Sequence, residues 1–507
     1  MHAAAQDAVI AFLTDPANER GAEPVKVIRT HISVVVLNGD RAYKLKRAVR
    51  LPYTDFSTAD LRLATCKAEF ALNTPTAPSL YLGVRRITRA AGGGLEFDGP
   101  GALVDAVVEM VRFDERDLFD RLAEGGALTP GLMATLAHGI AQFHAEAPVI
   151  RAGGGAENMA GVLDINRAGF ATGEVFGEAE VAAFDAAFRQ RLERHAAVLD
   201  AREARGLVRR CHGDLHLRNI CLFDGRPTLF DCIDFNDQIA TVDVLYDLAF
   251  LLMDLWHRNL GGLANLVANR YFDEIGEDAG YELLPFFMAV RAAVRAHVTG
   301  TFAKDCGADA PRQAAIAREY FDLALELLDA EPCGVTAIGG FSGSGKTTIA
   351  ETLAPRMPPP PGARVVESDR TRKAMFGVPA ETPLPPEAYD AEVSDEVYGR
   401  LAARSRALVE AGASVVVDAV FDRSDRRAAL AEALCGHRFA GFWLAADPDV
   451  LRHRIEVRPK GPSDATVEVL EAQLARATGS VEWSAIPSEQ SAEEVVQAML
   501  AGCLQGR

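Results

Sequence analysis

The sequence predicts an α+β domain over residues 1–330, followed by an α/β domain with a parallel sheet over residues 331–507. A chain of 507 residues is too long for one ordinary core, so more than one domain is expected. The first part opens with β-prone segments and continues into long Ala-rich helical patterns. Past residue 334, short strand and helix patterns alternate, which is typical of βαβ units around a parallel sheet.

The composition of the chain argues against some classes of binding partner. The net charge is −18, from 71 acidic and 53 basic residues, and such a surface repels nucleic acid and anionic lipid. The eight cysteines include no C-x-x-C pair and no zinc-ligand spacing, as expected of reduced thiols in the cytoplasm. Residues 1–20 lack the basic start and apolar core of a secretion signal, and no apolar run is long enough to span a membrane. We therefore expect a cytoplasmic protein with small-molecule substrates, and neither nucleic acid nor a membrane as partner.

The N-terminal part begins with a hairpin signal. Asn38-Gly39 separates two β-prone segments and favours a tight turn between them. The elements expected before residue 113 are a helix over 4–14, strands over 25–28, 34–37 and 42–45, a helix over 58–73, and strands over 80–84 and 104–112. Helical patterns follow at 118–200 and 243–328, and between them lie β-prone pieces at 207–208, 220–222 and 228–233.

The C-terminal part alternates between the two kinds of element. The expected strands are 335–338, 365–366, 415–417 and 439–444, and the expected helices are 347–353, 396–412, 426–434 and 450–454. Four consecutive prolines at 358–361 predict a stiff spacer at the surface.

The first domain contains the residue types that phosphoryl transfer requires. Asp214 and Asn219 stand five apart after a short predicted strand, and Asp234 lies at the end of a later one. The reaction needs a carboxylate to take the hydroxyl proton, and an amide oxygen with a second carboxylate on Mg²⁺. The alternative is that Asp214 and Asn219 are turn residues in a polar loop.

Residues 212–219, His-Gly-Asp-Leu-His-Leu-Arg-Asn, resemble the catalytic loop of protein kinases and aminoglycoside phosphotransferases. The resemblance implies a kinase-like fold, with Asp214 as the catalytic base, Asn219 as a metal ligand and Asp234 as the main metal ligand. Asp247 resembles the buried aspartate that steadies this loop in the phosphotransferases.

A kinase-like fold implies an upstream lysine–glutamate pair. Lys44 ends an A-x-K pattern that resembles the kinase lysine, and Glu69 on the following predicted helix is its implied partner. Lys46 points to the same face by the period of two and stays an alternative, as does a pair of surface lysines. Met110 falls where adenine would be contacted. No G-x-G-x-x-G precedes the lysine strand, which leaves Ser33 and nearby backbone to cover the phosphates.

Residues 340–347 read Gly-Phe-Ser-Gly-Ser-Gly-Lys-Thr and match the phosphate-binding loop pattern G-x-x-x-x-G-K-T. Glycines let backbone N–H groups turn inward around a polyphosphate, and the following helix N-terminus adds a favourable dipole. Lys346 is predicted to reach the β/γ-phosphates, and Thr347 to hold Mg²⁺. A Gly/Ser linker is the alternative, although linkers rarely separate a strand from a helix. The predicted nucleotide contacts are Gly340, Ser342, Gly343, Ser344, Gly345, Lys346, Thr347 and Thr348.

Carboxylates follow two strands of the second domain. Asp369 can accept a proton from a substrate hydroxyl, while Arg372 and Lys373 can hold an anion. The alternative is a helix N-cap followed by a solvated basic turn. Asp418 ends the strand at 415–417 and is a Walker-B-like carboxylate for the Mg²⁺ shell.

A cationic segment precedes a Gly/Pro-rich one. Arg454 and Arg458 lie just before residues 459–462, Pro-Lys-Gly-Pro, and arginines on a mobile flap over the phosphates fit a kinase lid. We therefore give Arg454 and Arg458 catalytic roles. The alternative is a solvent-facing basic helix, which the glycine and prolines disfavour because they indicate a hinge.

The second half resembles the small-molecule P-loop kinases, such as gluconate kinase, chloramphenicol phosphotransferase and the polynucleotide-kinase-like group. The order of motifs over nearly the whole chain is similar to a bacterial family of fused proteins that join an aminoglycoside-phosphotransferase-like domain to a P-loop kinase-like domain. The family label states kinship of fold and names no substrate. Our leading hypothesis is a bifunctional phosphotransferase acting on small hydroxylated molecules, with ATP or GTP and Mg²⁺ as cofactors. A second hypothesis is a nucleotide-regulated signalling or stress protein whose P-loop domain controls the other domain. A third is antibiotic resistance by drug phosphorylation.

Overall fold

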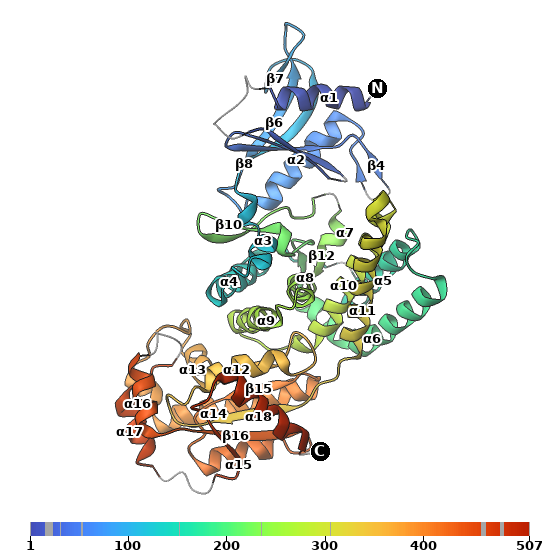
Figure 1. Cartoon of the computed structure of the whole chain (residues 1–507). Coiled ribbons are helices and arrows are strands. Elements are labelled where there is room, and N and C mark those ends of the chain that lie inside the picture. Colours follow the sequence, from blue (N-terminus) through green and yellow to red (C-terminus); the bar gives the residue numbers. More distant parts are fainter. Residues whose placement is uncertain are drawn as a thin grey trace. The chain divides into compact units, whose positions relative to one another are not determined.

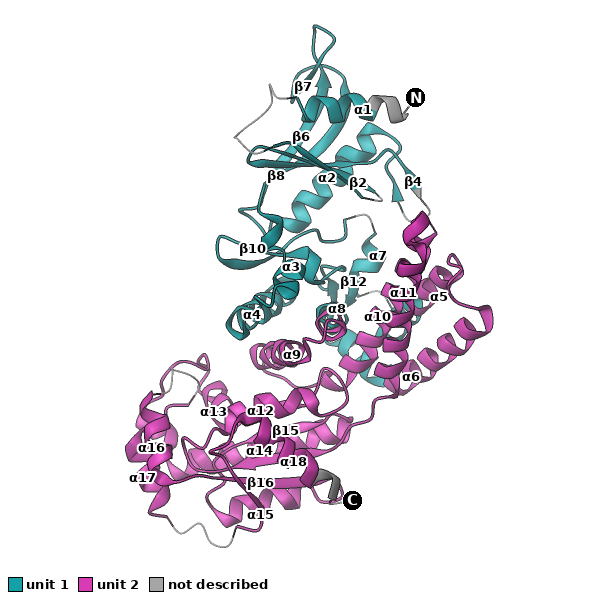
Figure 2. Cartoon of the chain, viewed as in Figure 1, with its two compact units in different colours: residues 1–162, 196–251 teal, residues 163–195, 252–507 magenta. Residues whose placement is uncertain are grey.

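The computed structural model describes all residues except 1, 16–23, 31, 52–53, 152, 235, 305, 458–462, 477–480 and 506–507. The chain forms two compact units (Figure 2). Unit 1 contains residues 1–162 and 196–251, and unit 2 contains residues 163–195 and 252–507. The predicted domain boundary at 330/331 stays a prediction. None of the described helices is both long and apolar enough to cross a membrane.

Unit 1 is built on a six-stranded antiparallel sheet of order β1-β2-β3-β8-β6-β7 (Figure 1). The strands are β1 Lys26–Arg29, β2 Ser33–Asn38, β3 Arg41–Lys46, β6 Tyr81–Arg89, β7 Leu95–Phe97 and β8 Leu103–Val111. The predicted hairpin is present: Asn38 pairs with Arg41 across a turn in which Gly39 has φ 58°. This left-handed conformation suits glycine. The hairpin fixes the register that places Val35 opposite Lys44.

Helix α2 (Ala59–Asn73) covers one face of this sheet. Thr58 caps its N-terminus by accepting a hydrogen bond from the Leu61 N–H. Its buried residues are Arg62, Cys66, Glu69 and Asn73, a spacing that places them on one helical face. Glu69 is thereby directed toward the strands. Helix α1 (His2–Leu13) contacts β2 and β8, and buries Val9 and Leu13.

The other strands and helices up to residue 330 include those that flank the catalytic-loop residues. The strands are β4 Arg50–Leu51, β5 Thr54–Asp55, β9 Val208–Arg210, β10 Ile220–Phe223, β11 Arg226–Leu229 and β12 Thr241–Asp243. The helices are α3 Phe119–Glu124, α4 Pro130–Glu146, α5 Gly155–Phe170, α6 Glu178–Ala204, α7 Asp237–Ala240, α8 Val244–His257, α9 Gly261–Ile275, α10 Leu284–Ala303 and α11 Ala310–Asp329.

Within unit 2, a five-stranded parallel sheet of order β14-β15-β13-β16-β17 forms what we call the P-loop domain. Its strands are β13 Val335–Gly339, β14 Arg364–Glu367, β15 Val415–Asp418, β16 Phe439–Ala445 and β17 Ser484–Pro487. Its helices are α12 Lys346–Leu353, α13 Ser368–Met375, α14 Ala391–Ala411, α15 Ser424–Ala433, α16 Pro448–Val457, α17 Val467–Leu474 and α18 Ala492–Gln505. The predicted fold class, a kinase-like α+β fold followed by a P-loop α/β fold, is confirmed.

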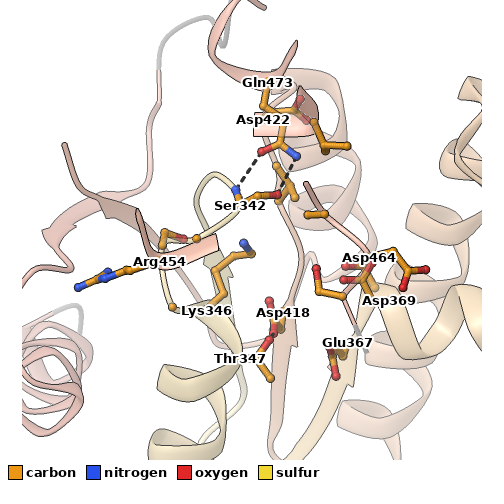
Figure 3. A pocket seen from close by; sticks show the side chains of 18 of the residues that line it. Ser342, Lys346, Thr347, Glu367, Asp369, Asp418, Asp422, Arg454, Asp464 and Gln473 are labelled. Carbon is orange, nitrogen blue, oxygen red and sulfur yellow. Dashed lines mark hydrogen bonds between the residues drawn. The ribbon is translucent and has the colours of Figure 1, made fainter. Parts of the chain in front are cut away.

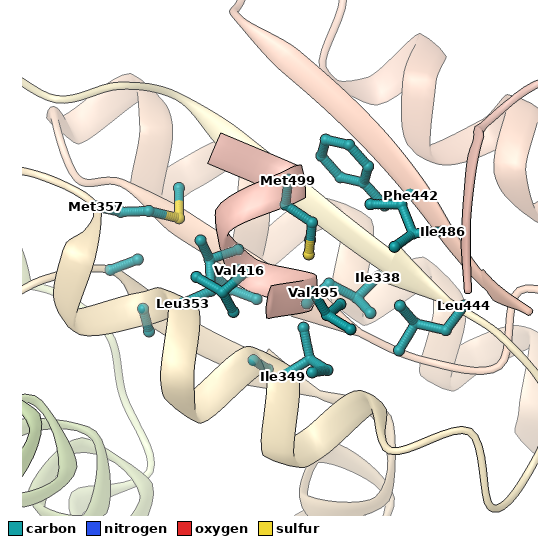
Figure 4. Close-up of a cluster of buried hydrophobic side chains, with 14 residues drawn as sticks. Ile338, Ile349, Leu353, Met357, Val416, Phe442, Leu444, Ile486, Val495 and Met499 are labelled. Atoms are coloured by element: carbon teal, nitrogen blue, oxygen red, sulfur yellow. The ribbon is translucent and has the colours of Figure 1, made fainter. Parts of the chain in front are cut away.

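The core of the P-loop domain lies between its sheet and helices α12 and α18 (Figure 4). Ile349 and Leu353 of α12 pack with Val495 and Met499 of α18 over Ile338 of the central strand. Burying each such side chain contributes about 1.5–3 kcal/mol relative to exposure. This packing fixes α12, and with it the phosphate-binding loop at its N-terminus.

The proline segment is not the surface spacer that the sequence suggested. Pro359, Pro360 and Pro361 are buried. The Tyr281 hydroxyl donates a hydrogen bond to the Gly362 carbonyl at 3.0 Å, so another part of unit 2 covers the segment. Composition alone could not reveal that cover.

Candidate active sites

In unit 1, the predicted lysine–glutamate pair is present, and both candidate lysines share it. Lys44 Nζ lies 2.7 Å from Glu69 Oε1, and Lys46 Nζ lies 2.8 Å from Glu69 Oε2. The two lysines alternate along β3 and so point to the same face. Burial alone would raise the pKa of Glu69, but the two ammonium groups lower it.

The two lysines differ in their second partners and in exposure. Lys46 is 1% exposed and pairs with Asp234 at 2.5 Å, so it is enclosed between two carboxylates. Lys44 is 12% exposed, and its second partner, Asp231, is 43% exposed. Lys44 is therefore the more accessible of the two lysines. Burial raises the pKa of Asp234, although Lys46 acts in the opposite direction.

Asp231 is a residue of this site that sequence reasoning missed. It lies three positions before Asp234 and adopts φ 63°, a left-handed conformation that aspartate tolerates better than most residues. Its backbone N–H donates to the Tyr81 hydroxyl at 3.2 Å, and its carboxylate contacts Lys44. The signal in the sequence was the repeated aspartate in residues 230–234, Phe-Asp-Cys-Ile-Asp.

The structure brings Asp214 and Asn219 together. Asn219 Nδ2 donates to both the carbonyl and the Oδ2 of Asp214, each at 2.9 Å. Asp247 on α8 is buried and accepts hydrogen bonds from the backbone N–H groups of His212 (3.1 Å) and Gly213 (2.8 Å). Gly213 has φ 83°, which glycine adopts without strain. Asp247 therefore holds the loop that presents Asp214, which is 40% exposed.

The other two predicted nucleotide contacts of unit 1 lie in the sheet. Ser33 begins β2 and is 2% exposed, and no hydrogen-bond partner for its Oγ is found among the described residues. Met110 lies in β8 opposite Ala42 and is 7% exposed. Their contacts with a nucleotide stay predictions.

In unit 2, the phosphate-binding loop connects β13 to α12, and its glycines are required by geometry. Gly340, Gly343 and Gly345 have φ of 146°, 84° and 86°. A Cβ on Gly340 would lie 2.8 Å from the Leu444 carbonyl, and one on Gly343 would lie 2.6 Å from the Leu451 carbonyl. Among the described residues, no hydrogen-bond partner is found for the buried Ser344 Oγ. A tight turn of this kind, at a helix N-terminus, fits a polyphosphate.

The two predicted metal ligands of the P-loop domain are in contact. Thr347 Oγ1 donates to Asp418 Oδ2 at 2.7 Å. Glu367 lies directly opposite Asp418 on the neighbouring strand, and sequence reasoning did not single it out. Burial and the second carboxylate raise the pKa of Glu367. A hydroxyl and a carboxylate in contact are an oxygen donor set that suits Mg²⁺.

A cavity of about 780 Å³ opens at the loop (Figure 3). The predicted residues that line it are Ser342, Gly343, Ser344, Gly345, Lys346, Thr347, Thr348, Asp369, Arg372, Asp418 and Arg454. Burial raises the pKa of Asp369, which favours its capacity to take a proton. Arg454 also donates to the Ser488 carbonyl at 2.9 Å. Arg458 lies outside the described residues.

Of the two predicted anion-binding residues, Arg372 lines the cavity and Lys373 does not. The Arg372 side chain lines the cavity, donates to the Ala388 carbonyl at 2.6 Å and lies 4.8 Å from the ring centre of Tyr389. Lys373 is not among the lining residues, and its Nζ pairs with Asp464 at 2.7 Å. Consecutive helical residues point about 100° apart, so one faces the cavity and the other does not.

Gln473 is another lining residue that the sequence did not reveal. Its Oε1 accepts from the Ser342 N–H at 2.9 Å and its Nε2 donates to Ser342 Oγ at 3.1 Å, as Figure 3 shows. Gln473 belongs to α17, which the sequence analysis did not predict. Arg426, Asp422 and Tyr398 also line the cavity.

The Mg²⁺ requirement of the P-loop site should depend on pH. Burial raises the pKa of Asp418 to about 6, and only its ionised form can bind a cation. Below about pH 6, the Mg²⁺ concentration for half-maximal ATP binding should therefore rise about tenfold per pH unit, while above about pH 7 it should stay constant. Mg²⁺ titrations of the binding of a fluorescent ATP analogue across this pH range would measure the dependence. The same half-maximal Mg²⁺ concentration below about pH 6 and above about pH 7 would contradict the prediction.

Comparison with known proteins gives matches for both domains. The model of the Phosphotransferase enzyme family matches residues 107–284, and an AAA domain model matches residues 335–479. Uncharacterized proteins of Mycobacterium tuberculosis (strain ATCC 25618 / H37Rv) and Mycobacterium bovis are 30% identical over 484 residues, which cover 89% of this chain and 90% of theirs.

Solved structures similar to each part include kinases. A gluconokinase from Sinorhizobium meliloti 1021 is 25% identical, with a TM-score of 0.25, over 34% of this chain and 94% of that one. A choline/ethanolamine kinase family protein from Mesorhizobium loti is 15% identical, with a TM-score of 0.38, over 64% of this chain and 98% of that one. The two family models make both domains phosphotransferase- or kinase-like, and such families generally use ATP and Mg²⁺. In this chain, the match to the Phosphotransferase enzyme family precedes the match of the P-loop domain to the AAA domain model. The chain belongs to the same family as the two mycobacterial proteins.

Proposed function

We propose that the protein is a bifunctional phosphotransferase that uses Mg²⁺ and ATP to phosphorylate hydroxyl groups of small molecules, with one site in each domain. The observation that carries the proposal is that each domain has its own candidate base and its own lysine. Asp214 and Lys44 belong to the first domain, and Asp369 and Lys346 to the second. A chain that only bound a nucleotide to change conformation would need neither base.

In the first domain, the Asp214 carboxylate takes the proton of the acceptor hydroxyl. Asn219 holds that carboxylate through its 2.9 Å hydrogen bond, and Asp247 fixes the backbone that leads to it. Lys44, kept in place by Glu69, supplies positive charge for the phosphates. Asp234 and Asn219 are the residues that would hold Mg²⁺, which neutralises phosphate charge when bound.

In the second domain, the phosphate-binding loop and Lys346 hold the polyphosphate. Asp369 lines the same cavity and takes the proton of an acceptor placed there, while Arg372 supplies positive charge on the same wall. Thr347 and Asp418 are the residues that would hold Mg²⁺. Arg454 lines the cavity as well and adds positive charge near the phosphates.

The test is transfer of labelled phosphate from ATP into an extract of small bacterial metabolites. The wild-type protein should label at least one small molecule, and the double variant Asp214→Asn/Lys346→Ala should label none. If the wild type releases phosphate, Lys346→Ala stops the release and no metabolite is labelled, the two-kinase proposal fails. A nucleotide-regulated ATPase then takes its place.

A further inference from the structure

Helix α9 completes the open edge of the P-loop sheet. Strand β14 is at the end of the strand order, and an edge strand leaves backbone N–H and C=O groups without strand partners. Asn269 Oδ1 accepts from the Val365 N–H at 2.8 Å. The Nδ2 groups of Asn265 and Asn269 donate to the Ala363 carbonyl at 3.0 and 3.2 Å. Two asparagine side chains thus satisfy one backbone N–H group and one backbone carbonyl along this edge.

Buried ion pairs reinforce this contact. Arg364 at the start of β14 has a side chain only 1% exposed, and it pairs with Asp273 at 2.7 Å and with Asp278 at 2.9 Å. Arg404 of α14 adds a second cation to Asp278 at 2.8 Å. A buried cation without a partner is costly, so these carboxylates fix where β14 sits relative to α9. All of these residues lie in unit 2 (Figure 2).

Asp273 also starts a series of contacts that ends at the predicted metal site. Its Oδ2 lies 3.6 Å from Arg370 Nη1, and Arg370 Nε lies 3.0 Å from Glu367 Oε2. Glu367 lies opposite Asp418 in the sheet, and Asp418 accepts from Thr347. Arg370 is not among the lining residues of the cavity, and its contact with the lining residues is through Glu367.

The electrostatic consequence follows from two buried carboxylates side by side. Glu367 and Asp418 repel each other in a medium of low dielectric constant. Arg370 offsets the charge of Glu367, and Asp273 is a second carboxylate near Arg370. The Asp418 carboxylate can then accept the hydrogen bond from Thr347 and bind a cation. Helix α9 also contacts the helix that begins at Lys346, because Arg270 pairs with Glu351 at 2.5 Å.

We propose that α9 supports the P-loop site. Asp273 of α9 is a positioning residue for this site and acts through Arg370 and Glu367. The inference rests on the proposed function of that site. Residues 107–284, matched by the phosphotransferase family model, include α9, so the first domain's region supplies a component of the second site. This dependence gives a physical reason for the fusion of the two domains.

The experiment measures ATP binding to the full-length protein with and without Mg²⁺, using a fluorescent ATP analogue. Binding that persists in Lys346→Ala is subtracted, so that only the P-loop site is counted. Asp273→Asn removes the counter-charge of Arg370 and should raise the Mg²⁺ concentration for half-maximal binding about five- to tenfold. Arg370→Gln removes a cation near the site and should lower that concentration by a similar factor, and both variants should leave Mg²⁺-free affinity within about twofold. In the double variant the two effects should largely cancel, because the substitutions remove the two opposite charges of one ion pair. Asp273→Glu should recover part of the loss.

Asp322→Asn on an exposed turn of α11 is the matched control and should behave as wild type. Arg370→Gln leaves the Arg364 pairs with Asp273 and Asp278 in place, so it tests the link even if Asp273→Asn does not fold. An unchanged Mg²⁺ requirement in Arg370→Gln overturns the inference. Equal losses with and without Mg²⁺ also overturn it, because they indicate a purely structural role. If the wild type shows no Lys346-dependent binding, the proposed function itself fails.

Discussion

Lys346→Ala should lower ATP turnover at the P-loop site by at least about 100-fold, equivalent to about 2.7 kcal/mol of transition-state stabilisation. Lys346 is the first residue of α12 and lines the 780 Å³ cavity with the phosphate-binding loop. Its ammonium group is the cation that the loop itself provides, and backbone N–H groups carry only partial charges. Removing it leaves the polyphosphate without that charge.

The measurement is steady-state phosphate release and fluorescent ATP binding, with thermal unfolding as a check on folding. Lys346 lies at a helix start, where alanine is tolerated, so Tm should change little. Arg406→Ala is a suitable control, because Arg406 is exposed on α14 and pairs with Glu410, four residues on. Turnover in Lys346→Ala within about threefold of the wild type would contradict the assignment of this loop as the nucleotide site.

Asp214→Asn should lower phosphoryl transfer at the first site by about 10² to 10⁴-fold, with little change in ATP affinity. The amide keeps the size of the carboxylate and can still accept the Asn219 hydrogen bond, so the loop should keep its shape. It cannot take the proton of an acceptor hydroxyl. The loss should therefore appear in kcat and not in the KM for ATP.

The first-domain site is isolated by making the substitution in a Lys346→Ala background and following labelled product. Asp224→Asn is the matched control: Asp224 is exposed in the β10–β11 turn at φ 49°, a conformation that asparagine also tolerates. Product formation that survives in Asp214→Asn but requires Asp234 would indicate that the base has been misassigned. A fall in ATP affinity equal to the fall in rate would point to damage to the loop.

Local features of both sites could be predicted from the sequence because short-range geometry dictates them. The glycines of the phosphate-binding loop sit at φ values that other residues avoid, so the pattern carries its own conformation. Asn38-Gly39 fixed the hairpin, and the period of two then placed Lys44 and Lys46 on one face. The α2 helix directs Glu69 to that face, because its buried positions repeat at helical spacing.

Other features were decided only when distant segments packed together. Glu69 pairs with both lysines, and Asp231 pairs with Lys44. These pairings depend on which elements meet across the site. Lys373 does not line the cavity but pairs with Asp464, a lining residue about 90 positions away. The short strand β17 and helix α17 carry weak local signals, and α17 provides Gln473.

The sequence by itself determined the two kinds of domain, the phosphate-binding loop and the carboxylates at strand ends, since backbone preference and residue spacing are local properties. The tertiary structure alone decided which charges pair, why the prolines at 359–361 are buried, and how α9 covers β14. Pairing and burial depend on contacts between residues as far apart as Asp273 and Arg364. No local pattern encodes such contacts, because each arises only when two separately formed surfaces meet.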